Sequence, residues 1–343
     1  MSKKTNETTL LILSLLITTG LVGGGIWFLT KNGLNLGILV NSQLKPTEQS
    51  SSNFTQVKNV PNGLFSYGGS TTWAPIRQVA EPAIQSSLPN FHLRYVQPTN
   101  KPPGSKVGIE MLINDQLTFS QSSSSIDKYL YQQAQARGFT LKEIPVAIDG
   151  IAVAVNPSLN ISGLTVAQLK DIYTGQVINW SQVGGPNLPI TIYSRRGENS
   201  GTVKFFIENV LQGQQFSPNT QYIPTTTEAA RAVSTNLGGV YFASAPEVVG
   251  QCKIKTLPIG LKSDKLVPPY QEPFVPLAQC PHPRNQVNAV AFRSGEYPLT
   301  RQLFVIVKQD GQITQQAGEA YANLLLTDQG QELIQQTGFV RIR

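Results

Sequence analysis

The sequence is poor in the residues on which metal centres and hydrolytic active sites depend. Of its 343 residues, two are histidines, His92 and His282, and they lie far apart in the chain. This scarcity disfavours a histidine-rich metal site, and it disfavours a serine hydrolase or phosphatase because the two distant histidines form no carboxylate–histidine cluster. We therefore expect no enzyme activity, no catalytic residues, and no bound metal or cofactor.

Charge of either sign is also scarce. Charged residues make up 14% of the chain, and 27 Lys and Arg against 20 Asp and Glu give a formal net charge of +7. Because the basic residues form no run, we expect no nucleic-acid partner, and the modest positive balance favours a small anion as ligand. Hydrophobic residues, at 40%, are numerous enough for a folded core.

The N-terminus contains a long apolar segment. Thr9 to Thr30 carries no charge and, at roughly 20 residues, can just cross a bilayer as a helix, with lysines on its cytoplasmic side. The alternative is a cleaved signal peptide, but Ile26-Trp27-Phe28-Leu29 stands where a small-residue cleavage site is expected. We favour a membrane anchor over residues 1–30, which makes the protein periplasmic and attached to the cytoplasmic membrane. Residues 31–59, rich in polar side chains, are expected to be a flexible tether.

The two cysteines, Cys252 and Cys280, both lie late in the chain. In an exported protein such a pair indicates one disulfide. It would close a loop of about 28 residues and stabilise the fold by roughly 3–4 kcal/mol. Two buried free thiols are the alternative.

Strand and helix signals alternate after residue 60. Ile144 to Val155 is nearly all apolar and predicts a buried strand pair that crosses between two lobes. Thr165 to Tyr173 predicts a short helix, Arg301 to Val307 a late strand, and Ala317 to Gln336 a helix. The alternation predicts an α/β protein with a mostly parallel sheet, in which ligands bind at helix N-termini beyond the strand ends.

Three segments share one design, in which a strand is followed by glycine and hydroxyl residues and then by a helix. They are Phe65 to Ile76, Pro103 to Leu112 and Ser194 to Val203, with Ser105 expected to cap the second helix. A helix start has unpaired backbone N–H groups and a partial positive charge, so it favours an anion. Each segment alone reads as an ordinary capped helix. Their repetition, with Arg195-Arg196 in the third, favours an oxyanion site.

These segments together resemble the periplasmic phosphate-binding protein of high-affinity phosphate ABC transporters, from about Gly63 to Arg343. The most specific part is Arg-Arg-x-x-x-Ser-Gly-Thr at residues 195–202. Also typical are Gly68 to Pro75, Leu169 to Gly175, Gly239 to Phe242 and Tyr297 to Arg301. The resemblance implies a two-lobed periplasmic-binding-protein fold, type II-like, that closes over dehydrated phosphate. It implies that lobe 1 comprises 60–149 and 240–343 and that lobe 2 comprises 150–239.

The resemblance also implies which residues bind phosphate. They are Thr71, the Thr72 backbone N–H, Ser105, Arg196, Ser200, Gly201 and Thr202, with Glu198 steering Arg196. One position departs from the family. Where the family often has an aspartate that accepts a hydrogen bond from protonated phosphate, this chain has Ser123, with Ser122 as the alternative.

The implied function is therefore non-catalytic. The protein is expected to bind inorganic phosphate outside the cytoplasmic membrane and to deliver it to the permease subunits of an ABC transporter. The alternatives are a receptor for another oxyanion, such as sulfate or molybdate, and a membrane-tethered phosphate sensor. Ser123 in place of a carboxylate predicts weaker rejection of sulfate, unless Glu110 or Asp149 reaches into the cleft.

Overall fold

The structure is a computed structural model that describes residues 52–197 and 200–343. The expected anchor over residues 1–30, residues 31–51 of the expected tether, and Glu198 lie outside the described residues. Within the two described ranges, no helix combines the length and the apolar character that a membrane span requires.

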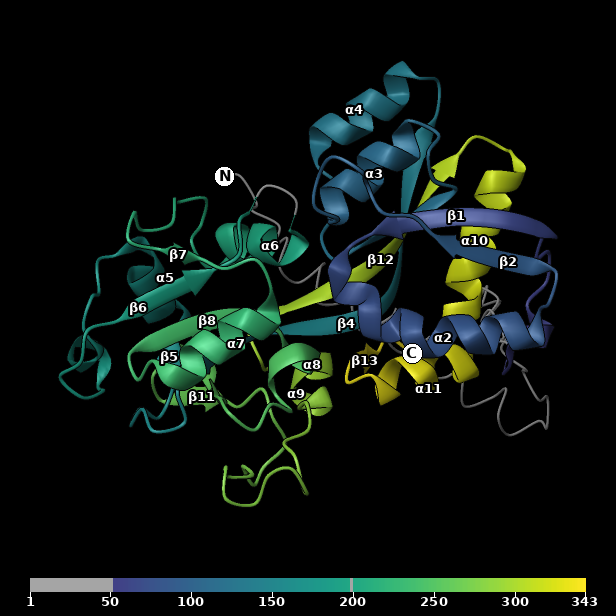
Figure 1. Cartoon of the computed structure of the whole chain (residues 1–343). Helices are drawn as coiled ribbons and strands as arrows, with labels where there is room; N and C mark the ends of the chain where they lie inside the picture. Colours follow the sequence, from purple (N-terminus) through teal and green to yellow (C-terminus); the bar gives the residue numbers. More distant parts are fainter. Residues whose placement is uncertain (1–51, 198–199) are drawn as a thin grey trace, which may run out of the picture. The chain divides into compact units, whose positions relative to one another are not determined.

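A mixed sheet runs through the described part of the chain, with helices packed around it (Figure 1). Its strands lie in the order β2-β1-β3-β12-β4-β8-β6-β7, and β13 and β9 also pair with β4. Their bounds are β1 Gly63–Gly69, β2 Phe91–Tyr95, β3 Phe119–Ser122, β4 Thr140–Val155, β6 Thr191–Ser194, β7 Gln221–Tyr222, β8 Gly239–Ser244, β9 Lys255–Leu257, β12 Thr300–Gln309 and β13 Val340–Arg341. A small separate sheet contains β5 Leu164–Thr165, β10 Ile259–Lys262 and β11 Lys265–Val267.

The helices connect these strands. Their bounds are α2 Ala74–Ser87, α3 Ser105–Ile113, α4 Lys128–Ala136, α5 Val166–Thr174, α6 Gly201–Asn209, α7 Thr226–Thr235, α8 Ala245–Val248, α9 Ala289–Ser294, α10 Ile313–Leu325 and α11 Asp328–Gln336, with short 3-10 turns η1 Phe54–Gln56, η2 Thr71–Trp73 and η3 Trp180–Val183. The prediction of one continuous helix from Ala317 to Gln336 is wrong, because this segment contains the end of α10 and all of α11. The two helices are separated at Thr327, whose side chain accepts a hydrogen bond from Gly330 N and caps α11.

The long strand β4 joins the two lobes. Its first part, Thr140 to Gly150, pairs with β12, and its last part, Ile151 to Val155, pairs with β8. Residues 149–155 are all buried, as expected of a strand that is covered on both faces. The crossing segment is thus one strand, not the predicted pair.

The directions of the strands only partly follow the prediction. β1 is parallel to β2 and β3, and β6 is parallel to β7 and β8. At the centre, β12 is antiparallel to both β3 and β4, and β4 is antiparallel to β8. The prediction of a mostly parallel sheet is therefore wrong at the centre, because β12 runs alongside β4 in the opposite direction.

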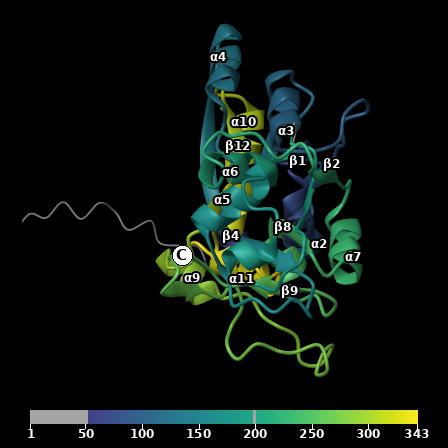
Figure 2. The same cartoon turned by 90° about the vertical axis from the view of Figure 1, so that its left-hand side faces the viewer.

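Three clusters of buried hydrophobic side chains form the cores of the two lobes. The first cluster, in one lobe, is built mainly from residues 151–299, and the other two, in the second lobe, are built from residues 54–147 and 303–339. Figure 2 shows α5 and α6, which belong to the lobe with the first cluster, facing the viewer. The expected lobe boundaries stay predictions, and the clusters favour placing residues 240–299 with the lobe that contains 150–239.

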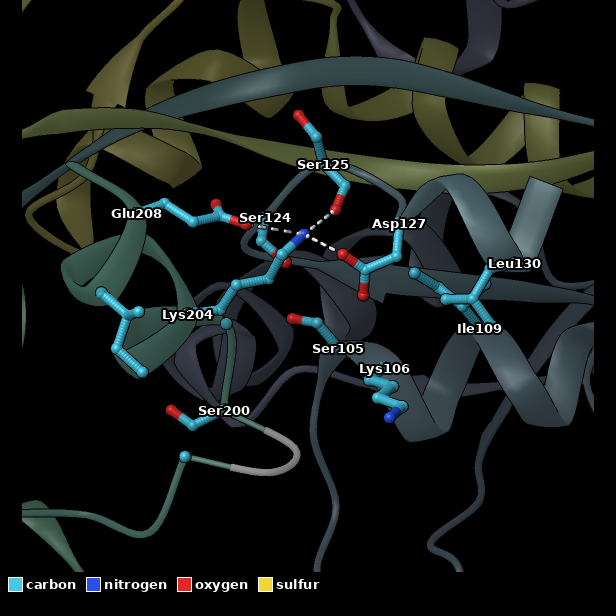
Figure 3. Close-up of a pocket in the computed structure, with 13 residues that line it drawn as sticks. Ser105, Lys106, Ile109, Ser124, Ser125, Asp127, Leu130, Ser200, Lys204 and Glu208 are labelled. Atoms are coloured by element: carbon cyan, nitrogen blue, oxygen red, sulfur yellow. Dashed lines mark hydrogen bonds and ion pairs between the residues drawn. The ribbon is translucent and has the colours of Figure 1, made fainter. Parts of the chain in front are cut away.

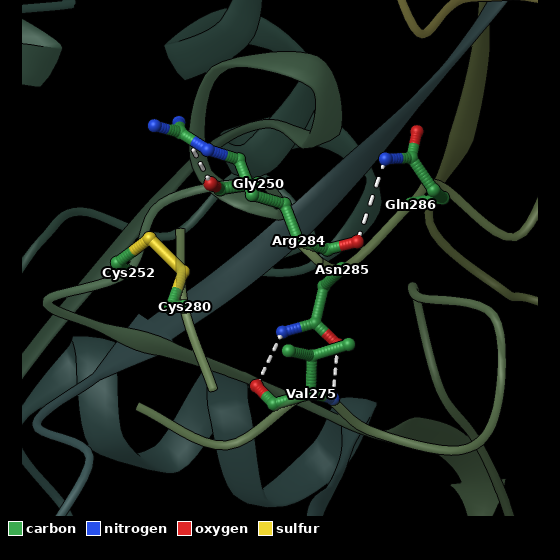
Figure 4. Close-up of a disulfide and its surroundings, with 7 residues drawn as sticks. All are labelled: Gly250, Cys252, Val275, Cys280, Arg284, Asn285 and Gln286. Atoms are coloured by element: carbon green, nitrogen blue, oxygen red, sulfur yellow. Dashed lines mark hydrogen bonds between the residues drawn. A yellow bond between two sulfur atoms is a disulfide. The ribbon is translucent and has the colours of Figure 1, made fainter. Parts of the chain in front are cut away.

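The structure joins Cys252 to Cys280 by a disulfide, with the two Cα atoms 5.7 Å apart (Figure 4). The segment beside it is held by Asn285, whose side chain accepts a hydrogen bond from Val275 N and donates one to Val275 O. Arg284 donates to Gly250 O, which precedes Cys252 by two positions. The disulfide therefore closes a loop that is also held by hydrogen bonds at its ends.

Candidate functional site

Three helix starts follow parallel strands of the sheet. η2 and α2 follow β1, α3 follows β2, and α6 follows β6. Because β1 and β3 are parallel neighbours, Ser70 and Ser123, which come directly after them, lie at the same edge. The two serine Oγ atoms are 2.9 Å apart.

The first helix start depends on a close approach of two backbones. Gly69 has φ +117°, and a Cβ atom there would lie 2.3 Å from the backbone oxygen of Gln121. Only glycine fits this position without strain. The chain then turns at Ser70, whose side chain accepts a hydrogen bond from Thr72 N. Thr72 is buried and Thr71 is partly buried.

The second helix start brings Ser105 to Ser123. Ser105 is the first residue of α3, whereas Gly104 occupies the cap position that we expected for Ser105. The Ser105 side chain accepts a hydrogen bond from Ser123 N at 3.0 Å, and its Oγ lies 3.3 Å from Ser123 Oγ. Both serines are buried.

The third helix start closes over the same point. α6 begins at Gly201, and the side chain of Ser200 caps it by accepting a hydrogen bond from Val203 N. A Cβ atom on Gly201 would lie 2.4 Å from Ser123 Oγ and 2.6 Å from Ser105 Oγ. Ser70, Ser105, Ser123 and Gly201 therefore meet, and we call them the hydroxyl cluster.

Between the two predicted candidates, the structure brings Ser123 rather than Ser122 to the hydroxyl cluster. Ser122 Oγ instead donates a hydrogen bond to Ser124 O, and Ser122 O accepts one from Trp73 Nε1. The carboxylate of Glu110 forms an ion pair with Lys101 at 3.4 Å.

Two arginines lie beside the hydroxyl cluster. Arg301 on β12 is buried and donates hydrogen bonds to Thr202 Oγ1 at 2.9 Å and to Thr72 Oγ1 at 3.4 Å. Arg195 is partly buried and donates to Thr71 Oγ1 at 3.4 Å. Each guanidinium thus reaches hydroxyls that belong to the helix starts.

The structure does not bring Arg196 to the hydroxyl cluster. Its side chain is exposed, and its guanidinium carbon lies 5.0 Å from the centre of the Tyr222 ring. Both arginines lie just after β6 ends at Ser194, and their side chains have different neighbours, Thr71 for Arg195 and Tyr222 for Arg196. The geometry therefore favours Arg195 over Arg196 as a partner of the helix starts.

Two carboxyl groups, Asp149 and Glu247, lie close enough to the arginines to interact with them electrostatically. Asp149 accepts two hydrogen bonds from Arg301 and one from Ser244 Oγ. Burial raises the pKa of Asp149, and the Arg301 guanidinium opposes this shift. Burial and the nearby Asp149 raise the pKa of Glu247, and Arg195 and Arg301 oppose it. Among residues 52–197 and 200–343, no group of His, Cys, Asp and Glu side chains has the arrangement of a metal site.

A cavity of about 280 Å³ adjoins the hydroxyl cluster between α3, α4 and α6 (Figure 3). Ser105, Ser200 and Gly201 are among the residues that line it. On its wall, Lys204 of α6 forms an ion pair with Asp127 at 2.8 Å and donates a hydrogen bond to Ser125 O. This contact ties α6 to the loop before α4.

The sequence matches the PBP superfamily domain over residues 47–329. The chain belongs to the PBP superfamily. It is similar to Protein SphX of Synechococcus elongatus, with 26% identity over 294 residues that cover 83% of this chain and 79% of SphX. It is also similar to the phosphate-binding protein PstS of Staphylococcus haemolyticus, with 26% identity over 266 residues that cover 76% of each chain.

A solved structure shows the same fold. It is a putative phosphate ABC transporter substrate-binding protein from Clostridium perfringens with bound phosphate, and its TM-score is 0.65 at 21% identity. The match covers 82% of this chain and 100% of that chain. The described lobes and sheet are therefore those of a mixed α/β, two-lobed member of the PBP superfamily.

Two arginines beside the helix starts were not singled out from the sequence. Sequence reasoning gave no separate role to Arg195 or Arg301, which the structure joins to Thr71, Thr72 and Thr202, and it named Asp149 as one of two carboxylates that could reach the cleft. The one local signal that pointed to Arg301 was its position at the end of the Tyr297 to Arg301 segment, which is typical of the family that the sequence resembles. The pairing of Arg301 with Asp149 depends on sheet register, which no local motif encodes.

Proposed function

We propose that this protein binds inorganic phosphate between its two lobes outside the cytoplasmic membrane and delivers it to the permease subunits of an ABC transporter. The observation that carries the proposal is the convergence of three helix starts on Ser123. Unpaired N–H groups and helix dipoles favour an anion at such a point. The names of the relatives support phosphate as the anion, since one is called a phosphate-binding protein and a solved neighbour holds phosphate.

The ligands in this proposal come from every helix start. They are Thr71, the Thr72 backbone N–H, Ser105, Ser123, Ser200, Gly201 and Thr202. Hydroxyl and backbone donors can replace the water shell of the anion, and a serine hydroxyl can serve either a protonated or a bare oxygen. The contact of Arg195 with Thr71 supports Arg195 in the charged role. The roles of Arg196 and Glu198 rest on the resemblance alone and are not part of this proposal.

The remaining parts of the chain serve delivery in the same proposal. Residues 1–30 anchor the protein in the cytoplasmic membrane, and residues 31–51 give the body room to reach the permease. Residues 52–59 of the expected tether belong to the body instead, because Phe54 of η1 is buried in its hydrophobic core. The disulfide between Cys252 and Cys280 forms in the oxidising periplasm.

Calorimetric titration of the purified full-length protein with phosphate tests the proposal, with sulfate and molybdate as competitors. We expect one phosphate per chain, bound more tightly than sulfate or molybdate, with measurable competition by sulfate because Ser123 stands in place of a carboxylate. Absence of heat, together with no effect of phosphate on thermal unfolding, would refute it. Tighter binding of sulfate or molybdate would show a receptor for another oxyanion, and phosphate binding without stimulation of a reconstituted permease would favour a sensor.

A further inference from the structure

A buried guanidinium joins the first and third helix starts. The side chain of Arg301 is 3% exposed, and its Nη2 donates to Thr202 Oγ1 at 2.9 Å and to Thr72 Oγ1 at 3.4 Å. Thr72 precedes α2 and Thr202 is the second residue of α6. One charged group therefore contacts both lobes at the place where we propose that phosphate binds.

Asp149 fixes the orientation of this guanidinium. Arg301 and Asp149 face each other directly across the antiparallel pair of β12 and β4. Both Nε and Nη2 of Arg301 donate to Asp149 Oδ2, at 3.0 and 2.8 Å. Because the guanidinium is planar and its donor directions are fixed, this contact occupies one edge and turns the Nη1 end away from Asp149.

The Nη1 atom is the unusual feature. It is buried, and within the described residues it has no hydrogen-bond partner. A buried, charged donor without an acceptor is costly, so native structures rarely leave one. One N–H of Nη2 points to the hydroxyls of Thr72 and Thr202. In a planar guanidinium, one N–H of Nη1 lies along the same edge as this N–H and points in the same direction.

We propose that Arg301 is a phosphate-binding residue whose Nη1 donates to a phosphate oxygen between the two lobes, and that Asp149 is the positioning residue that aims it. The proposal rests on the phosphate-binding function proposed above. It gives the buried Nη1 donor an acceptor, and it supplies the anion with a charged partner that reaches both lobes at once. A lone ion pair that only holds β4 to β12 is the competing explanation.

The test compares Arg301→Gln and Arg301→Lys with a matched control on the same strand. Lys308→Gln also removes a largely buried cation of β12, one that pairs with Asp115 and Asp310. Full-length proteins are titrated with inorganic phosphate by calorimetry, and circular dichroism and thermal unfolding establish the folded fraction. Arg301→Lys keeps the charge without the planar fork, so it remains informative if Arg301→Gln does not fold.

We expect phosphate affinity to fall roughly 10- to 100-fold in folded Arg301→Gln, because a charge-assisted hydrogen bond to the anion is lost, and to fall less in Arg301→Lys. Lys308→Gln should bind within threefold of the wild type even if its melting temperature falls. Arg301 variants that unfold at a lower temperature but bind phosphate within threefold of the wild type would show that the ion pair is purely structural. That result would overturn the inference about Arg301 but leave the proposed phosphate-binding function intact. A wild-type protein that does not bind phosphate would overturn the proposed function as well.

Discussion

Replacing Gly201 with alanine tests the candidate site at its most crowded point. The added Cβ atom would lie 2.4 Å from Ser123 Oγ and 2.6 Å from Ser105 Oγ, whereas ordinary contact begins at 3.4 Å. Either both hydroxyls or the start of α6 must therefore move by about 1 Å. A movement of that size takes a hydrogen bond out of its favourable distance range.

The size of the effect follows from the hydrogen bonds at stake. A hydrogen bond to a charged partner contributes about 1.5–3 kcal/mol, so losing one weakens phosphate binding roughly 10- to 100-fold. The free energy of unfolding should change less. Overpacking costs about 1–3 kcal/mol, and the higher helix propensity of alanine offsets up to about 1 kcal/mol of it.

Gly250→Ala is the matched control for this substitution. At Gly250 an added Cβ atom would meet only the backbone oxygen of Asn285, at an ordinary 3.6 Å. Calorimetry should show weaker phosphate binding for Gly201→Ala and unchanged binding for Gly250→Ala, with both proteins folded by circular dichroism. Phosphate affinity of Gly201→Ala within threefold of the wild type would show that the anion does not lie at the start of α6.

Other measurements test separate parts of the molecule. Because Arg196 is exposed and faces Tyr222, Arg196→Ala should bind phosphate within threefold of the wild type, whereas the resemblance alone implies a large loss. Ser123→Asp should raise the preference for phosphate over sulfate, since a buried carboxylate needs a proton on the anion, and an unchanged ratio would place Ser123 outside the site. Mass spectrometry of membrane-fraction protein should find residues 32–45 joined to the body, and a mature N-terminus between residues 25 and 50 would show cleavage. Non-reducing peptide mapping should recover Cys252 bridged to Cys280, and full alkylation without reductant would exclude the bridge.

Elements with a strong local signal could be predicted from the sequence. The expected helix from Thr165 to Tyr173 is α5, because Thr165 and Gln168 form a reciprocal cap at its start and Gly175 ends it in a left-handed conformation. The apolar segment that ends at Val155 is likewise a buried strand. The directions of the central strands were not predictable in this way, because they depend on how distant segments pair.

The same distinction holds for the candidate site. Glycine and hydroxyl residues before a helix are a local pattern, so the loops that contain Ser105 and Gly201 were found, and the structure brings them together. The ion pair between Asp149 and Arg301 joins residues 152 positions apart. It exists because these two residues are register partners on β4 and β12, and a shift of one residue would turn one of them to the other face of the sheet.

The choice between Arg195 and Arg196 shows the same limit at the smallest scale. The two residues are identical and adjacent, so composition, charge and motif spacing treat them alike. They differ in the neighbours that each side chain meets after β6 ends at Ser194. Arg195 reaches Thr71 at the first helix start, and Arg196 lies over Tyr222 at the edge of the sheet. A motif can therefore indicate that an arginine lies near the helix starts, but only the folded chain shows which of the two contacts Thr71.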